Sequence, residues 1–86
     1  MKYIIQYKRS ASEELLELPA IYAHKILAAI NNLADDPRPR ACKKLKGGNH
    51  VYRIRIGNYR VVYTISDNIL TVVVIKIGHR KHIYKK

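Results

Sequence analysis

Hydrophobic and polar residues alternate most regularly on either side of Gly57-Asn58. This dipeptide suits a two-residue turn, so the alternation predicts a β-hairpin in which Arg55 pairs directly with Arg60. Arg53 lies diagonally from Arg60 on the same face. Because like charges placed opposite each other are destabilising, we interpret these three arginines as a surface for a polyanionic partner. The other face of the hairpin is expected to join the core through Tyr52, Ile54, Ile56, Tyr59, Val61 and Tyr63.

A strand at about residues 3–8 and two helices are expected before the hairpin. Ser10 and Glu13 fit a capping box at the start of a short helix, and Pro19 either ends that helix or opens the next one. The pair of helices is expected to lie as a helical hairpin over a sheet. The second helix is indicated by apolar residues at helical spacing, namely Tyr22, Ile26, Ile30 and Leu33.

The second half of the chain is expected to complete a four-stranded sheet, which makes the fold α+β. Residues 37–50 lack periodicity and are interpreted as a loop. Asp67-Asn68 fits a second two-residue turn, which would pair Arg60 with Ile75. The last strand is apolar on both faces and is therefore expected to be central. The antiparallel meander consists of strands at about residues 51–56, 59–66 and 69–77.

The chain is expected to form one domain, residues 1–86, around one modest core. Its formal net charge is +11, from 17 Lys and Arg against 6 Asp and Glu. The charge is concentrated after residue 36, where 13 of the cations but only one acid, Asp67, are found. This excess favours a nucleic acid, a ribosome or an acidic protein as the partner.

The single cysteine, Cys42, can form neither an internal disulfide nor, by itself, a zinc site, which favours a cytoplasmic location. The apolar stretch at the N-terminus is too short and too interrupted for a signal peptide, and no apolar run is long enough for a membrane anchor. The chain has no paired carboxylates for general acid and base catalysis and no acidic cluster for magnesium or calcium, so the sequence predicts no metal and no cofactor.

The chemistry that remains is metal-free handling of a phosphodiester by cations. In RNA, the 2′-hydroxyl can attack the adjacent phosphorus while fixed guanidinium groups stabilise the charge on the phosphoryl oxygens. Arginine transfers protons poorly, because its pKa stays above about 12. His79 and His82, or a leaving group stabilised by Arg80, are therefore the candidates for proton handling.

Three segments of the chain resemble the RelE branch of the RelE/ParE toxin superfamily. They are Lys44-Leu45-Lys46-Gly47, the hairpin segment 52–63, and Ile77-Gly78-His79-Arg80 with Tyr84. The resemblance implies a RelE-like fold and a toxin of a type II toxin–antitoxin system, with a cognate RelB-like antitoxin as partner. It also implies a ribosome-dependent endoribonuclease that cleaves messenger RNA in the ribosomal A site and thereby inhibits translation.

The same resemblance implies roles for individual residues. Arg53 and Arg55 stand where the family has catalytic lysines or arginines, and Arg60 stands where it has a phosphate-stabilising arginine. Arg80 corresponds to an arginine that supports the leaving group, and Tyr84 to a tyrosine that stacks on a base of the substrate. Other cations are expected to bind RNA or steer the chain toward ribosomal RNA, namely Lys43, Lys44, Lys46, Lys81 and Lys85.

Other interpretations stay open. A ParE-like member would inhibit DNA gyrase by binding it, without nuclease activity, although the basic set and Tyr84 resemble RelE more than ParE. A basic module that binds RNA or the ribosome would block translation without cutting. The arginine face could also be an ordinary solvated sheet face. The codon preference and the identity of the antitoxin do not follow from the sequence.

Overall fold

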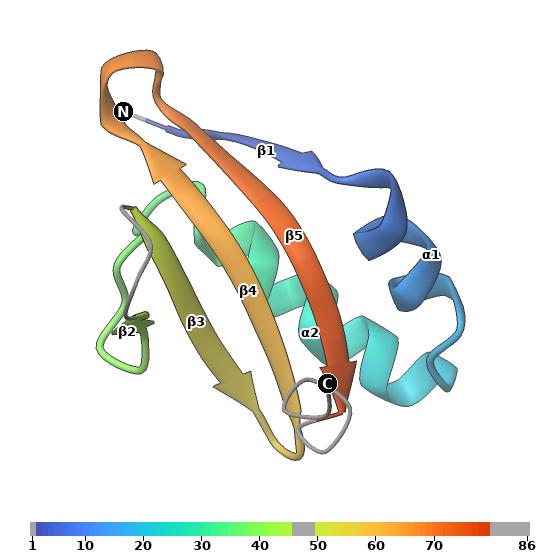
Figure 1. Ribbon diagram of the computed structural model, residues 1–86. Helices are drawn as coiled ribbons and strands as arrows, with labels where there is room; N and C mark the ends of the chain where they lie inside the picture. The colour runs from blue at the N-terminus through green and yellow to red at the C-terminus, as the bar shows by residue number, and fades with distance from the viewer. Residues whose placement is uncertain (1, 46–49, 80–86) are drawn as a thin grey trace.

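The computed structural model describes residues 2–45 and 50–79 of the chain. The expected α+β order is confirmed, with a strand, two helices and an antiparallel meander (Figure 1). The elements are β1 (Ile4–Tyr7), α1 (Arg9–Leu16), α2 (Ala20–Asn32), β2 (Lys43–Lys44), β3 (Val51–Ile56), β4 (Tyr59–Ser66), the 3₁₀ helix η1 (Asp67–Ile69) and β5 (Thr71–His79).

The sheet has five strands where four were expected, in the order β1-β5-β4-β3-β2. Strand β1 runs parallel to β5, and the other neighbours are antiparallel. The additional strand is β2, inside the segment that the sequence indicated as loop. Its two residues, Lys43 and Lys44, pair with Arg53 and Tyr52. Two residues are too few to show a periodicity, so this strand could not be recognised from the pattern.

The turn between β4 and β5 differs from the expected two-residue turn at Asp67-Asn68. The chain forms η1 and then places Leu70 in the left-handed region, with φ of 48°. The register is also irregular between Val62 and Tyr63. As a result Arg60 pairs with Gly78 and not with Ile75, because the longer turn shifts the pairing by two residues and the irregularity by one more.

The predicted capping box at the start of α1 is wrong. Helix α1 begins at Arg9, and its N-cap residue Lys8 makes no side-chain capping bond. Ser10 therefore lies inside the first turn, where its hydroxyl is not in the capping position. The second interpretation of Pro19 is confirmed, because this residue is the N-cap of α2.

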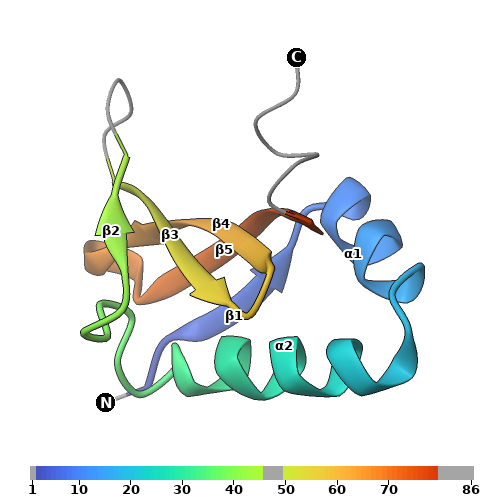
Figure 2. The ribbon, with the colours of Figure 1, turned by 90° about the horizontal axis from the view of Figure 1, so that it is seen from below.

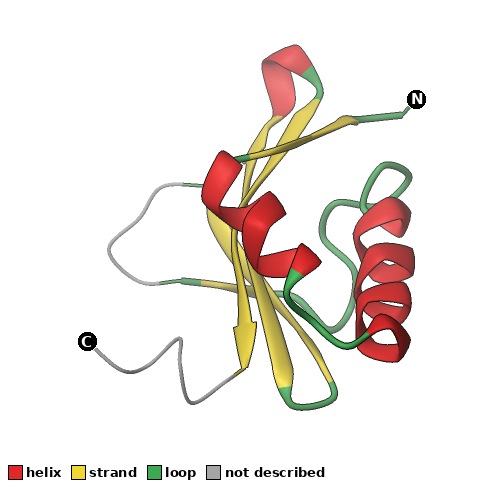
Figure 3. Ribbon diagram, turned by 90° about the vertical axis from the view of Figure 1, so that its right-hand side faces the viewer, coloured by secondary structure: helices red, strands yellow, loops and turns green. Residues whose placement is uncertain are grey.

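The two helices leave one face of the sheet uncovered by helix within the described residues. Helix α2 runs across one face (Figure 2), and α1 packs against β5 on the side of the sheet where β1 is the edge strand (Figure 3). We call the sheet surface opposite α2 the open face. Strand β5 lies between β1 and β4, in agreement with its apolar character. The core between α2 and the sheet contains Ile26, Ile30, Leu33, Ile54, Val61, Tyr63, Ile65, Val72, Val74 and Ile77.

Candidate nucleic-acid interface

The predicted juxtaposition of two arginines is confirmed by the hairpin register. Arg55 of β3 pairs directly with Arg60 of β4, next to the turn. Gly57 has φ of +60°, as the first central residue of a type II′ turn requires. Directly paired residues point to the same side of a sheet, so Gly78 of β5, opposite Arg60, completes a row across three strands.

A second row lies two residues along, on the same face. Arg53 pairs with Lys43 of β2 on one side and with Val62 of β4 on the other. Val62 in turn pairs with Lys76 of β5. This row therefore crosses four strands and carries a cation on three of them.

The three arginines of the open face differ in exposure. Arg55 is exposed, Arg53 is half-buried, and Arg60 is only 3 % exposed. Within the described part of the chain, the buried Nε of Arg53 has no hydrogen-bond partner. Burial of a cation costs desolvation free energy. Burial also reduces the dielectric screening around the cation, which strengthens its attraction for an anion that reaches it. The open face thus combines one accessible cation with two deeper ones.

The described strands of the sheet contain no acidic residue. All six acids of the chain belong to the described ranges, and five of them lie in α1, in α2's C-terminal connection or between the two helices. The sixth, Asp67, lies in η1, where it pairs with Arg38 at 2.9 Å. Glu14 of α1 pairs with Lys76 at 3.2 Å and also accepts the backbone N–H of Ile77 at 2.7 Å. Within residues 2–45 and 50–79, neither Arg53 nor Arg55 forms an ion pair with a carboxylate.

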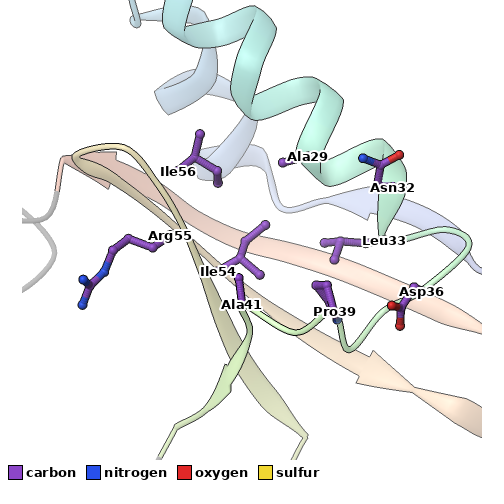
Figure 4. A pocket seen from close by; sticks show the side chains of 9 residues that line it. All are labelled: Ala29, Asn32, Leu33, Asp36, Pro39, Ala41, Ile54, Arg55 and Ile56. Carbon is purple, nitrogen blue, oxygen red and sulfur yellow. The ribbon is translucent and has the colours of Figure 1, made fainter.

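The opposite side of β3 has a different chemistry. A cavity of about 260 Å³ lies between β3, α2 and the connection that follows α2. Figure 4 shows Ile54 directed toward this cavity and Arg55 directed away from it. The polar residues that line the cavity are Arg55 and, at and just after the C-terminus of α2, Asn32 and Asp36. The cavity therefore offers few groups for phosphate chemistry.

One of the basic residues has a structural role that the sequence did not reveal. Arg38 donates to both carboxylate oxygens of Asp67, at 2.9 and 3.3 Å, and to the hydroxyl of Tyr52 at 3.2 Å. Hydrogen bonds from Arg38 and then from Tyr3 lower the pKa of Asp67 to about 2. Burial is the main cause of the raised pKa of Tyr63, whose hydroxyl donates to Pro37 O at 2.8 Å. These bonds fasten the connection after α2 to the sheet.

The remaining candidate residues divide into two groups. His79 pairs with Tyr59 and contacts its ring edge-on, with centroids 5.5 Å apart. Because Tyr59 packs against the core, His79 lies on the helix side of the sheet, across from Arg55 and Arg60. Lys44 pairs with Tyr52 and lies on the helix side as well. The candidates outside the described residues are Lys46, Arg80, Lys81, His82, Tyr84 and Lys85.

Two findings on the described residues bear on metals and membranes. No three His, Cys, Asp or Glu side chains within residues 2–45 and 50–79 are grouped so that they could hold a metal ion. In the same ranges, no helix combines the length and the apolar character that crossing a bilayer requires.

The chain is similar to known proteins in both sequence and fold. The model of the ParE toxin family of type II toxin–antitoxin systems matches residues 5–84. Toxin RelG of Mycobacterium tuberculosis is 32% identical over 88 positions that span 100% of both chains. The structure is similar to the toxin–antitoxin complex RelBE2 of M. tuberculosis, with a TM-score of 0.80 and 28% identity over 93% of this chain and 100% of that chain. It is also similar to the RelE–RelB complex of Pyrococcus horikoshii, with a TM-score of 0.82 and 27% identity over 93% and 97% of the two chains.

Proposed function

The chain belongs to the RelE/ParE superfamily of toxins from type II toxin–antitoxin systems, and we propose that it is a ribosome-dependent endoribonuclease that cleaves messenger RNA in the ribosomal A site. The observation that carries this proposal is the cluster of Arg53, Arg55 and Arg60 on the open face of a sheet whose described strands contain no acidic residue. The paired arginines repel each other, which costs stability, and a bound phosphodiester would offset this repulsion.

In the proposed reaction, the 2′-oxygen of a ribose attacks the adjacent phosphorus. A P–O bond to the 2′-oxygen forms as its hydroxyl loses a proton, and the bond to the 5′-oxygen breaks as this oxygen gains a proton. The products are a 2′,3′-cyclic phosphate and a 5′-hydroxyl. Arg53 and Arg55 stabilise the charge on the phosphoryl oxygens, because a guanidinium group can donate two parallel hydrogen bonds. Arg60 acts from the base of the open face on a phosphate that reaches it. Arg80 supports the departing 5′-oxygen, and Tyr84 stacks on a base.

Two histidines are the candidates for moving the proton in this reaction. His79 is on the helix side of the sheet, so its imidazole is not directed at the row of Arg55 and Arg60. His82 remains the other histidine candidate, outside the described residues. The ribosome supplies much of the substrate geometry in this proposal, since few groups of such a small surface can orient RNA.

A RelB-like antitoxin is the proposed partner. The solved structures similar to this chain include RelE–RelB and RelBE2 toxin–antitoxin complexes. The helical layer exposes large apolar side chains, among them Leu16 and Ile21, which a partner could cover. An antitoxin segment rich in acids would in addition suit the open face, where neither Arg53 nor Arg55 has an ion pair within the described residues.

Inhibition of DNA gyrase is the second candidate function. It is favoured by one observation, which is that the matching family model describes the toxin of parDE systems. A gyrase inhibitor acts by binding and needs no group that stabilises a phosphoryl transition state. The open face would then be a protein-binding or DNA-binding surface, and cleavage of RNA would be absent. A chain that binds RNA or the ribosome without cutting would block translation with intact message.

Primer extension on a messenger RNA in a reconstituted translation system, with and without ribosomes, tests the proposal. We expect ribosome-dependent stops within codons for the wild type, and a loss of about 10²-fold or more for Arg55→Ala and Arg60→Ala. Arg9→Ala removes an equal charge from exposed α1 and should cleave normally. Since Arg60 is buried, its variant also needs a check of folding by circular dichroism.

Intact message with the folded wild-type chain would overturn the nuclease proposal. A block of gyrase-dependent DNA supercoiling would then support the ParE-like function. Inhibited translation with intact message would support the binding module instead.

A further inference from the structure

Lys43 and Lys44 are consecutive exposed lysines of β2, yet the sheet register places them on opposite faces. Lys43 pairs with Arg53 and therefore belongs to the open face. Lys44 pairs with Tyr52, whose ring packs against the core. In the sequence the two lysines were equivalent, because nothing in the pattern indicated a strand there.

The neighbour on the N-terminal side gives independent support for this alternation. Cys42 packs against the core cluster, on the helix side of the sheet. Because successive side chains of an extended chain point to opposite sides, a core-directed Cys42 places Lys43 on the open face and Lys44 on the helix side again. Two separate observations, the strand pairing and the packing of Cys42, thus agree on the direction of Lys43.

The two ends of the row that contains Arg53 differ in available charge. At the β5 end, Lys76 is paired with Glu14 at 3.2 Å. At the β2 end, Lys43 has no ion pair within the described part of the chain. Cationic charge for a ligand is therefore concentrated toward β2.

We propose that Lys43 binds a phosphate of single-stranded RNA next to the phosphate held by Arg53, so that the RNA backbone crosses the open face from β4 toward β2. This inference rests on the proposed function in its choice of RNA as the ligand. Paired strands lie about 5 Å apart, and the flexible stem of lysine widens its reach, so Lys43 and Arg53 can contact neighbouring phosphates of one chain. Lys44 makes no such contact.

Binding of a 2′-O-methylated oligoribonucleotide, which lacks the attacking hydroxyl and stays intact, tests the proposal. For single strands each phosphate contact contributes about 0.7 to the slope of log affinity against log salt concentration. We expect Lys43→Ala to lower this slope by about 0.7 and to weaken binding at 50 mM salt by about threefold. Lys43→Arg should keep both values, and Lys25→Ala, on exposed α2, is the control for the loss of one charge.

Lys44→Ala separates a contact at a defined face from general attraction by charge. The inference is overturned if Lys43→Ala and Lys44→Ala weaken binding equally, or if neither weakens it. It is also overturned if the wild-type chain binds no oligonucleotide. A selective effect of Lys43 supports it even if messenger RNA is never cleaved, because this binding assay needs no cleavage. The converse outcome is cleavage that depends on Arg55 while Lys43→Ala and Lys44→Ala weaken oligonucleotide binding equally. That result would support the nuclease proposal and overturn only this inference.

Discussion

Replacing Arg55 by Gln is expected to stabilise the fold while it weakens RNA cleavage, because Arg55 lies directly opposite Arg60. Backbones of paired strands are about 5 Å apart and long side chains splay, so we take about 7 Å between the two guanidinium groups. Coulomb's law then gives a repulsion of about 0.6 kcal/mol at the permittivity of water and about 1.2 kcal/mol at half that value. This range agrees with the roughly 0.2–1 kcal/mol typical of cross-strand pairs.

A double-mutant cycle isolates this repulsion from the other effects of each substitution. Arg55→Gln and Arg60→Met keep much of the side-chain length, which limits the cavity left by the buried Arg60. The free energy of unfolding is measured by urea denaturation for the wild type, both single variants and the double variant. We expect a coupling of about 0.5–1 kcal/mol with the sign of a repulsion.

Salt provides the control for the electrostatic origin. The Debye length falls from about 30 Å at 0.01 M salt to about 3 Å at 1 M salt, so the coupling should decrease across this range. A coupling of zero at low salt, or an attraction that salt does not change, would refute the argument that the pair costs stability. The functional interpretation of the open face would then lose its main physical support.

Three further predictions concern the elements that hold the open face in position. Gly57→Ala should destabilise the hairpin by about 1 kcal/mol, as measured by urea denaturation, because the φ of +60° is unfavourable for alanine. Steric overlap does not contribute, since a Cβ at this position meets no atom within 4 Å. Tyr63→Phe removes the donor to Pro37 O and should cost about 1–2 kcal/mol by the same method. The pKa of Asp67 is lowered from 3.8 to about 2, chiefly by the hydrogen bond from Arg38. The ionised carboxylate therefore stabilises the fold fully above about pH 4, and this stabilisation is lost as the pH falls toward about 2. In acid unfolding, Asp67→Asn should lack this part of the pH dependence.

The hairpin could be predicted from the sequence because its determinants are local. A two-residue turn at Gly57-Asn58 fixes the pairing of the next residues, and the alternation then assigns each side chain to a face. The facing of Arg55 and Arg60 follows from these two facts alone. The family resemblance rested largely on the same segment, which is why the fold class was predictable as well.

The surroundings of the hairpin could not be predicted, because they depend on packing over longer distances. The 3₁₀ helix η1 lengthens the connection between β4 and β5, and the irregularity opposite Val62 and Tyr63 adds one residue within β5. Neither has a sequence signal as clear as a glycine turn. The short edge strand β2 likewise depends on β3 as its partner. The direction of Lys43 and the role of Arg38 therefore became visible only in the structure.

The shifted register determines the environment of the most deeply buried arginine. With the expected pairing, Ile75 would have lain beside Arg60 on the open face, and its branched side chain would have competed for the same space. The observed register places Gly78 there, and no side chain competes with Arg60 from β5. The residue before Gly78 in that strand, Ile77, donates its backbone N–H to the carboxylate of Glu14 in α1. The turn, the extra residue of β5 at Ile75 and α1 therefore act together, because each fixes the segment of β5 that leaves room for Arg60 at the base of the open face.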